Sequence, residues 1–428
     1  MGRKRQPYYK IILIIFFYFL SNNNIFPQQL KFKDYVYNDS IKTVILYANN
    51  NPLSYPIIRL NSNDKLTLIF DDITGNARNL SVNFIHCDEN WEPSNISVME
   101  YMDNFDSDYI INYDYSINTF IYYVHYRYTF PNDNINFKIS GNYIIYVTDN
   151  DNNEILLSKR FSITETQVEV NLTVKTPELP LYRKNFQELY VEIDFDGFKE
   201  LASPIDEIKL VILQNNRWNI AHKNIKPYLV ENNKIIYKYS DKLLFKGNNE
   251  FRYFNTNSTR FLSQHIATIR YEKPIYHFYL YADAVKKHKQ YIYEKDLNGK
   301  YKIDVQEGND PELQADYVMV HFYLPYDYPF AIGDLYINGE LTNWTFTDLN
   351  KLKYDYKHKA YYGSLLLKQG YYNYCYTLKE KKSGKIDSFT IEGSYNDTEN
   401  DYLAYVYYKP TGKLYTRLIA VKKINTLK

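Results

Sequence analysis

The segment Val318-Met-Val320-His-Phe322-Tyr-Leu324 decides the fold class, because an apolar side chain occupies every second position. The same alternation recurs at 168–174 and 122–130. Successive side chains of a strand point to opposite faces of a sheet, so each stretch can bury one face. Turn signals rich in Asn, Asp and Gly, such as 149–153 and 296–299, separate these stretches, and no long amphipathic helix pattern interrupts them. The sequence therefore predicts an all-β chain of sandwich domains.

The composition is that of a globular protein. The chain has 428 residues, 45% of them hydrophobic, with 51 Lys and Arg against 50 Asp and Glu. At about 100 to 200 residues per domain, this length predicts two to four domains. The charged fraction of 24% is ordinary, and the near-balance of charge gives no electrostatic attraction to nucleic acid. The 49 Tyr residues suit pleated, half-buried surfaces and further favour strands over helices.

The N-terminus has the pattern of a signal peptide. Four basic residues within the first ten precede the apolar run 11–20 (IILIIFFYFL). A membrane-spanning helix needs about 20 apolar residues, so an uncleaved anchor is the weaker alternative. No cysteine lies near the run, which argues against a lipid anchor. We predict a signal peptide over 1–27, cleavage between Ser21 and Gln29, and an exported mature chain without a transmembrane segment.

Pro-containing and polar connecting segments along the chain predict three domains. A first β-sandwich domain spans 28–165 and ends before the Pro-containing connection 175–180. A middle β domain spans 166–305, and the polar segment that follows it introduces a C-terminal domain at 306–428. The two cysteines, Cys87 and Cys375, fall in different predicted domains, so we expect unpaired, buried thiols.

The sequence contains no recognisable catalytic or metal-binding motif. It lacks G-x-S-x-G, G-x-G-x-x-G, P-loop and H-E-x-x-H patterns, and its eight His residues are scattered. Ser62 and Lys65 have the spacing of a serine–lysine dyad but lie in a polar turn. The acidic loop 149–154 lacks the Gly and the distal Glu of an EF-hand. We therefore predict no catalytic residue, no metal, no cofactor and no enzymatic activity.

One stretch of the C-terminal domain resembles the glycogen-binding, early-set immunoglobulin-like domains. It reads DLYINGELTNW over 334–344 and is followed by the aromatic run Tyr371-Tyr-Asn-Tyr374 after Gly370. In the carbohydrate-binding members an exposed Trp stacks on sugar, so Trp344 is a candidate carbohydrate-stacking residue. A structural Trp that covers the sandwich core fits the sequence equally well.

Six blocks in order resemble the type IX secretion system plug protein family, formerly an uncharacterised domain family of exported bacterial proteins. The blocks are H-C-D-E-N-W-E-P-S at 86–94, the run from 115 to 143, R-Y-F at 252–254, L-L-L-K-Q-G-Y-Y-N-Y at 365–374, E-G-S at 392–394 with T-E-N-D-Y at 398–402, and R-L-I at 417–419. The motif residues, which we expect to be structural, are His86, Trp91, His125, Tyr126, Pro131, Arg252, Gly370, Asn400, Tyr402 and Arg417. Ala420 departs from the pattern, because a Gly is expected there. Trp91 follows the apolar strand 82–85, so we expect it in the core of the first domain.

The resemblance implies tandem immunoglobulin-like β-sandwich domains and a function in protein export. It implies a periplasmic protein, peripherally associated with the outer membrane, that docks on the translocon barrel of the type IX secretion system and occludes its channel when cargo is absent. Docking would use aromatic surface, because Tyr and Trp are enriched at interface hot spots. The alternatives are an exported surface glycan-binding protein that uses the C-terminal domain, and a secreted cargo enzyme, for which a catalytic constellation is missing.

Overall fold

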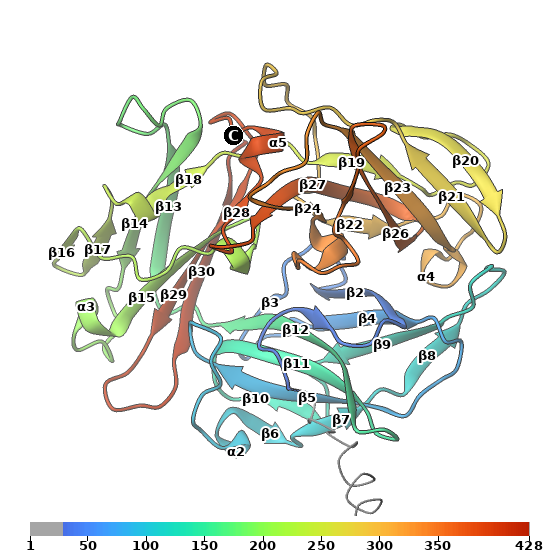
Figure 1. Ribbon diagram of the computed structural model, residues 1–428. Coiled ribbons are helices and arrows are strands. Elements are labelled where there is room, and N and C mark those ends of the chain that lie inside the picture. The colour runs from blue at the N-terminus through green and yellow to red at the C-terminus, as the bar shows by residue number, and fades with distance from the viewer. Residues whose placement is uncertain (1–28, 428) are drawn as a thin grey trace, which may run out of the picture. The chain divides into compact units, whose positions relative to one another are not determined.

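The prediction of an all-β chain is confirmed by the computed structural model, which describes residues 29–427 (Figure 1). Strands account for 45% of the chain and helices for 6%. From Phe32 onward the chain forms one compact unit. Its strands form three two-layered groups, here called sandwiches 1, 2 and 3. The predicted signal peptide lies outside the described residues.

Sandwich 1 is continuous in sequence. One sheet has the order β1-β12-β11-β5-β7, with β3 beside β12, and the other has the order β2-β4-β9-β8. Its elements are β1 (Tyr35–Val36), β2 (Ile41–Ala48), β3 (Ile57–Arg59), β4 (Leu66–Asp72), β5 (Leu80–Cys87), α2 (Val98–Tyr101), β6 (Met102–Asn104), β7 (Ser107–Tyr109), β8 (Asn112–Tyr115), β9 (Val124–Phe130), β10 (Ile135–Phe137), β11 (Gly141–Asp149) and β12 (Glu154–Thr164). Aromatic side chains from both sheets, including Phe84, Phe130 and Phe161, fill its core.

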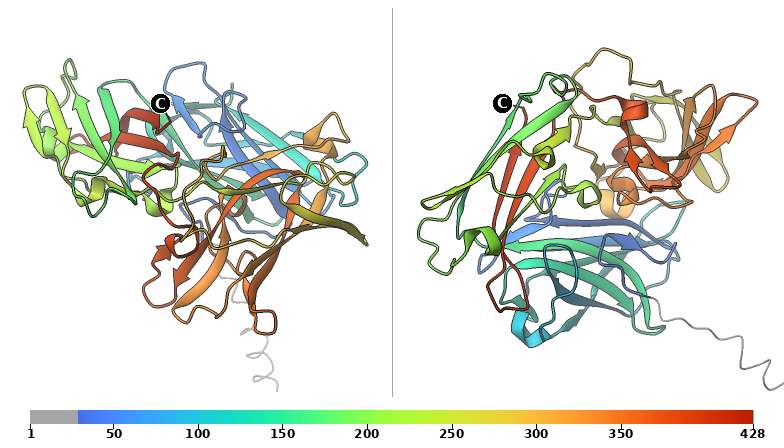
Figure 2. Two further views of the ribbon diagram at one scale, coloured as in Figure 1. Left: turned by 90° about the horizontal axis from the view of Figure 1, so that it is seen from above. Right: turned by 60° about the vertical axis from the view of Figure 1, so that its left-hand side comes forward.

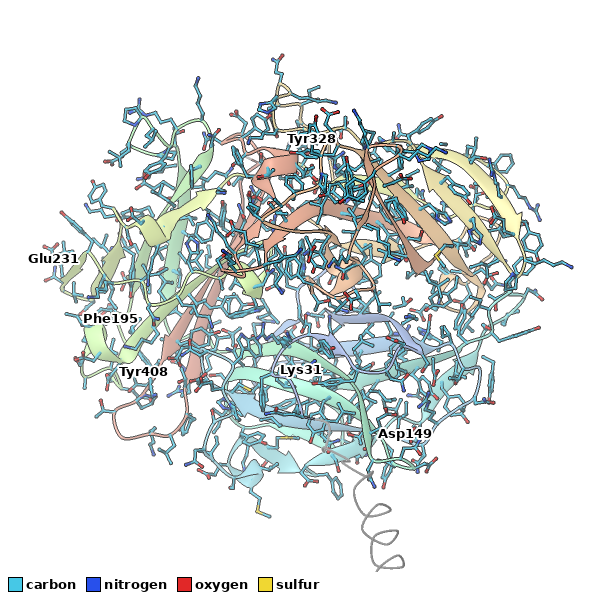
Figure 3. The ribbon with its side chains drawn as sticks, in the orientation of Figure 1. Lys31, Asp149, Phe195, Glu231, Tyr328 and Tyr408 are labelled. Carbon is cyan, nitrogen blue, oxygen red and sulfur yellow. The ribbon has the colours of Figure 1, made fainter. Side chains whose placement is uncertain are left out.

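Sandwich 2 is built from two distant parts of the chain. Its first sheet contains β13 (Glu169–Lys175), β14 (Phe186–Asp194), β16 (Leu229–Glu231), β17 (Lys234–Tyr237) and β18 (Leu244–Lys246). Its second sheet has β29 (Asp401–Tyr408) between β15 (Ile208–Gln214) and β30 (Arg417–Asn425). Its short helices are α3 (Pro204–Glu207), η1 (Trp218–Ile220) and η2 (Asp241–Leu243). Figure 1 and both views of Figure 2 show the C-terminal strands beside the middle segment. In Figure 3, Phe195 and Tyr408 accordingly lie on the same sandwich.

Sandwich 3 contains the strands between these two parts. One sheet contains β19 (Arg252–Asn255), β22 (Tyr301–Ile303), β24 (Gly333–Asn338), β27 (Gly370–Glu380) and β28 (Ile386–Asp387). The other has the order β20 (Ile266–Glu272), β21 (Ile275–Leu280), β23 (Tyr317–Pro325), β26 (Ala360–Lys368) and β25 (Lys353–Asp355). Its helical turns are α4 (Pro311–Gln314), η3 (Glu340–Thr342) and α5 (Phe389–Glu392).

The sheets therefore divide the chain differently from the predicted boundary at 305. The strands between 252 and 303 pair with sandwich 3, whereas the last two strands return to sandwich 2. The polar segment that suggested a boundary at 305–316 is a connection within sandwich 3 that includes α4. Turn residues mark where a strand ends, but they do not specify which strand it pairs with. The strands of sandwich 1, by contrast, all lie within the predicted first domain.

Two strands are buried on both faces, and they join the sandwiches. In β29, Tyr402 and Val406 point into the core of sandwich 2, while Tyr405 and Tyr407 point toward a cluster that includes Tyr55 of sandwich 1. In β4, alternate residues face the core of sandwich 1, and Ile69 on the other face joins the core of sandwich 3. A strand buried on both faces is apolar almost throughout rather than alternating.

Candidate functional site

The contact between sandwiches 1 and 3 contains a buried ionic group, here called the Asp71 cluster (Asp71, His125, Lys368, Tyr317 and Glu312). Asp71 lies on β4, and its side chain is completely buried. Its carboxylate accepts hydrogen bonds from Lys368 Nζ and the Tyr317 hydroxyl of sandwich 3, both at 2.7 Å. His125 Nδ1 lies 2.7 Å from the same carboxylate, because β4 and β9 pair Asp71 with His125. One carboxylate thus links two sandwiches.

Electrostatics within the Asp71 cluster favour the charged forms of its acids. Burial alone would raise the pKa of Asp71, but Lys368 and His125 hold that pKa below its usual value. Burial would lower the pKa of His125, but its contacts with Asp71 and Glu312 raise the pKa overall. The His125 ring, whose Nε2 lies 3.4 Å from the Glu312 carboxylate, and the Arg127 guanidinium lower the pKa of Glu312 to about 2. Asp71 and Lys368 are 0% and 1% exposed, so this ion pair is a structural tie between the two sandwiches.

The contact between sandwiches 1 and 2 includes Trp91, which is 3% exposed. Its ring meets Trp218 edge to face, with centroids 4.9 Å apart, and the Arg160 guanidinium lies 4.6 Å from its centroid. Trp91 is therefore buried, as predicted, but not inside the core of the first domain alone. Trp218 comes from sandwich 2, so Trp91 belongs to an inter-sandwich cluster.

Two further motif residues lie near the same contact. His86 Nδ1 lies 2.8 Å from Ser94 Oγ, and burial lowers the pKa of His86 to about 4, so the ring is neutral at pH 7. A Cβ at position 141 would come within 2.3 Å of His86 Nε2, which explains the glycine there. Arg417 of β30 pairs with Glu165 at the end of sandwich 1, with a shortest N–O distance of 2.6 Å.

The other motif residues occupy structural positions. In sandwich 2, Asn400 Nδ2 donates to Gln187 Oε1, and the Tyr402 hydroxyl donates to the same oxygen. Arg252 is buried between Glu392 and Asp283, and these carboxylates raise its pKa despite the burial.

Three motif positions remain. The Tyr126 hydroxyl accepts a hydrogen bond from the Arg78 backbone N–H. The Pro131 carbonyl accepts one from Lys65 Nζ. At Gly370 the Lys302 carbonyl of β22 approaches so closely that a Cβ would meet it at 2.3 Å.

Trp344 has little space for a sugar. It follows η3 and is half-buried, with the Arg217 guanidinium of sandwich 2 4.2 Å from its ring centroid. Phe251 contacts it edge to face, and Gly299 lies against the ring. The cavity that Trp344 helps to line has a volume of about 40 Å³, close to the space of a single water molecule in the liquid. This geometry favours the structural interpretation of Trp344, a contact between sandwiches 2 and 3.

The two cysteines are free and buried, as predicted. Cys87 lies on β5 of sandwich 1 and Cys375 on β27 of sandwich 3. Burial raises the pKa of Cys87 to about 12 and that of Cys375 to about 11, so neither forms a thiolate at neutral pH.

We expect a maleimide to label two thiols in the denatured, unreduced protein and to label the native protein far more slowly. The physical reason is that both sulfur atoms are buried and protonated until the sandwiches unfold. Intact-mass spectrometry measures the number of labels. Denatured protein that takes up no label without reductant would indicate a disulfide and contradict the prediction.

Within residues 29–427, no group of three or more His, Cys, Asp or Glu side chains is arranged to hold a metal ion. In the same part of the chain, no helix has the length and apolar character of a membrane span.

Exposed apolar side chains gather along one edge of sandwich 1, here called the aromatic edge. Its members come from β7, β8 and the adjoining loops and are Phe105, Tyr109, Ile111, Tyr113, Tyr115, Ile117, Phe120 and Tyr122. Ile111 is 79% exposed and Tyr122 is 71% exposed. Phe120 also contacts Tyr271 and Tyr276 of sandwich 3 through its ring. Exposed apolar side chains that gather in this way mark interaction sites on soluble proteins.

Comparison with known proteins identifies the family. The family model of the type 9 secretion system plug protein first domain matches residues 41–165, the strands of sandwich 1 from β2 onward. The crystal structure of a hypothetical protein from Parabacteroides merdae is 32% identical and superposes with a TM-score of 0.89, covering 93% of this chain and 100% of that one. The chain belongs to the type IX secretion system plug protein family. Membership associates this plug family protein with the type IX secretion machinery and indicates that it is exported.

More distant comparisons add nothing to this assignment. The three N-terminal domains of the bacteriophage RB49 outer capsid protein Hoc are 10% identical, with a TM-score of 0.16 and coverage of 89% of this chain and 96% of that one. Escherichia coli alpha-2-macroglobulin activated by porcine elastase is 11% identical, with a TM-score of 0.18 and coverage of 90% and 30%. Comparison of the plug family protein with curated proteins gives no match.

Proposed function

We propose that the chain is a non-enzymatic gate of the type IX secretion system. It docks from the periplasm on the outer-membrane translocon barrel and occludes the channel when no cargo is passing. The observation that carries this proposal is membership of the plug family, with sandwich 1 matching the family's first domain.

Three features of the molecule support a gating role. A plug must resist deformation, and the buried contacts of Asp71, Trp91 and Arg417 tie the sandwiches together. A folded domain of about 100 residues has a radius of gyration of about 13 Å, so one sandwich can close a pore through which proteins pass. The aromatic edge supplies apolar surface for a protein partner.

Deleting the gene is expected to make the outer membrane permeable to large hydrophilic antibiotics only in cells that still make the translocon. The reason is that an open export channel lacks its occluding domain. Growth inhibition by such an antibiotic is measured in the single deletion, in a strain lacking the translocon, and in the double deletion. Equal sensitivity in the single and double deletions, or no increase with the channel present, would contradict the gate.

The deletion strains also test where the protein docks. The double variant Ile111→Asp/Tyr122→Asp places two charges on the aromatic edge, whereas Leu181→Asp changes a side chain of sandwich 2 that is 81% exposed. We expect only the double variant to lose co-purification with the translocon and to leave the antibiotic sensitivity uncorrected. If both variants restore the barrier, the aromatic edge is not the docking surface, while the deletion result still decides whether the protein is a gate.

A further inference from the structure

A cavity of about 300 Å³ lies where sandwiches 2 and 3 meet. Sandwich 2 contributes Phe186, Leu244 and Phe245 to its lining, and the segment 385–388 of sandwich 3 closes the other side. Ile220 of η1 and Ile386 add further apolar surface. Ligand pockets of folded proteins are of this size and are mainly apolar, with few polar groups.

Arg217 lines this cavity and is almost fully buried, with 4% of its surface exposed. Its Nε has no hydrogen-bond partner, and among the described residues no Asp or Glu side chain forms an ion pair with it. The Trp344 ring covers one side of the guanidinium, with its centroid 4.2 Å from Cζ. A guanidinium stays charged at neutral pH even when burial lowers its pKa, as it does here.

An unpaired buried charge is unusual, because the loss of hydration is normally offset by a carboxylate partner. Elsewhere in this chain, Arg252 and Arg417 are paired with carboxylates. Cation–π contact with Trp344 holds the plane of the Arg217 guanidinium but satisfies none of its N–H donors. Arg217 is therefore a lining residue of this cavity whose Nε donor has no hydrogen-bond partner.

The charges around the cavity favour an anion. Lys246 and Lys385 also line it, and the only carboxylate in its lining is that of Asp387, which lies 3.8 Å from Lys246 Nζ. Asp387 is already engaged, because it accepts hydrogen bonds from the Phe389 backbone N–H and the Thr390 hydroxyl. His222, also in the lining, is stacked on Phe245, and burial lowers its pKa, so its ring is neutral at pH 7.

We propose that this cavity binds an organic monocarboxylate, with the carboxylate on Arg217 and an apolar body against the Phe and Leu side chains of sandwich 2. A guanidinium offers two parallel N–H donors that match the two oxygens of a carboxylate. The apolar lining selects an anion that carries a hydrocarbon portion, in preference to sulfate or phosphate. The bound carboxylate belongs either to a free organic acid or to the C-terminus of a peptide, which share this chemistry. The inference does not depend on the gating role.

Calorimetric titration of the full mature chain with octanoate tests the site. We expect saturable binding of octanoate, at least tenfold weaker binding of octanol, which has the same chain without the charge, and no binding of sulfate at equal concentration. N-acetylphenylalanine and its amide then distinguish the sources, because a site for peptide C-termini binds the acid more tightly than octanoate and rejects the amide. Absence of octanoate binding, or equal binding of octanol, would overturn the proposal.

Arg217→Met is the decisive variant, because it removes the charge and nearly keeps the side-chain volume. We expect at least a tenfold loss of octanoate affinity together with a higher melting temperature, since an unpaired buried charge is replaced by an apolar group. A residue that serves only packing would not move these two readouts in opposite directions. Arg270→Met, which alters an arginine outside the cavity, is expected to change neither.

A cavity-filling variant keeps the proposal testable if Arg217→Met fails to fold. Ile220→Trp leaves the charge in place and occupies the apolar part of the cavity, so it is expected to abolish octanoate binding. Octanoate should also raise the melting temperature of the unaltered protein by mass action and leave that of Ile220→Trp unchanged. Unaltered octanoate affinity in both Arg217→Met and Ile220→Trp would place the ligand elsewhere and refute the assignment.

Discussion

Asp71→Ala is expected to lower the free energy of unfolding by about 3 to 5 kcal/mol, the range for removing one partner of a buried ion pair. The substitution leaves the Lys368 ammonium buried without its carboxylate and removes the acceptor of the Tyr317 hydroxyl. His125 loses the same partner. Urea denaturation followed by circular dichroism measures the loss. Asp114→Ala on β8, which β9 separates from β4 in the same sheet, is the matched control, because Asp114 is exposed and its removal should change stability by less than about 0.5 kcal/mol.

A double variant distinguishes the effect of the two charges on stability from the effect of the volume that the side chains fill. Asp71→Asn/Lys368→Met removes both charges and keeps similar volumes, so we expect it to recover at least half of the stability lost in Asp71→Ala. A cost below about 1 kcal/mol for Asp71→Ala would show that the cluster is not a tie between sandwiches 1 and 3.

The contribution of Asp71 to the free energy of unfolding also depends on pH. Because its partners lower the pKa of Asp71 below 3.8, the stabilisation is complete above that pH and is lost as the pH falls through the folded-state pKa.

Trp91→Ala is expected to cost about 3 to 5 kcal/mol, the range for emptying a large aromatic site. The indole is 3% exposed and is enclosed by Trp218 and Arg160, so its removal opens a void between sandwiches 1 and 2. Trp91→Phe should cost clearly less, because it keeps an aromatic ring in the same place. Circular dichroism is a better probe of unfolding than Trp fluorescence, because the chain has only three Trp residues and the substitution removes one of them.

A double-mutant cycle tests whether Trp91 acts through Trp218. Because the two rings touch, Trp91→Ala and Trp218→Ala should not be additive, with a coupling of about 0.5 to 3 kcal/mol. Additive losses would place Trp91 in the core of sandwich 1 alone. A Trp91→Ala protein that melts normally but no longer binds the translocon would instead make Trp91 a docking residue.

Several residues that hold the sandwiches together could have been suspected from the sequence. Asp71 directly follows the apolar strand residues 66–70, and Lys368 follows 365–367. A charged residue at the end of a buried strand signals a buried partner, because an unpaired charge there is costly. The sequence gives no sign that these two residues are partners, since they belong to different sandwiches. No pattern in the sequence distinguishes Trp218, Arg160 and Arg217 from ordinary surface or core residues.

The all-β class and the plug family follow from local patterns along the chain. Alternation of apolar and polar residues with period two is a local property of a strand, so it does not depend on how the strands are arranged. The burial of side chains along β14 alternates strictly in this way. The family blocks are likewise contiguous in the chain. His86, Trp91 and Arg252 could be singled out from such blocks before any contact was known.

Which strands pair and which faces meet depends on packing in three dimensions. β29 lies beside β15, although the whole of sandwich 3 separates them in the chain, and this pairing moved the predicted domain boundary. The same packing joined Trp91 to Trp218, covered Trp344 with Arg217, and left Arg217 without a carboxylate. The physical reason is that an antiparallel partner is selected by matching apolar faces and hydrogen-bond register across space, and neither quantity is encoded in the spacing of residues along one strand.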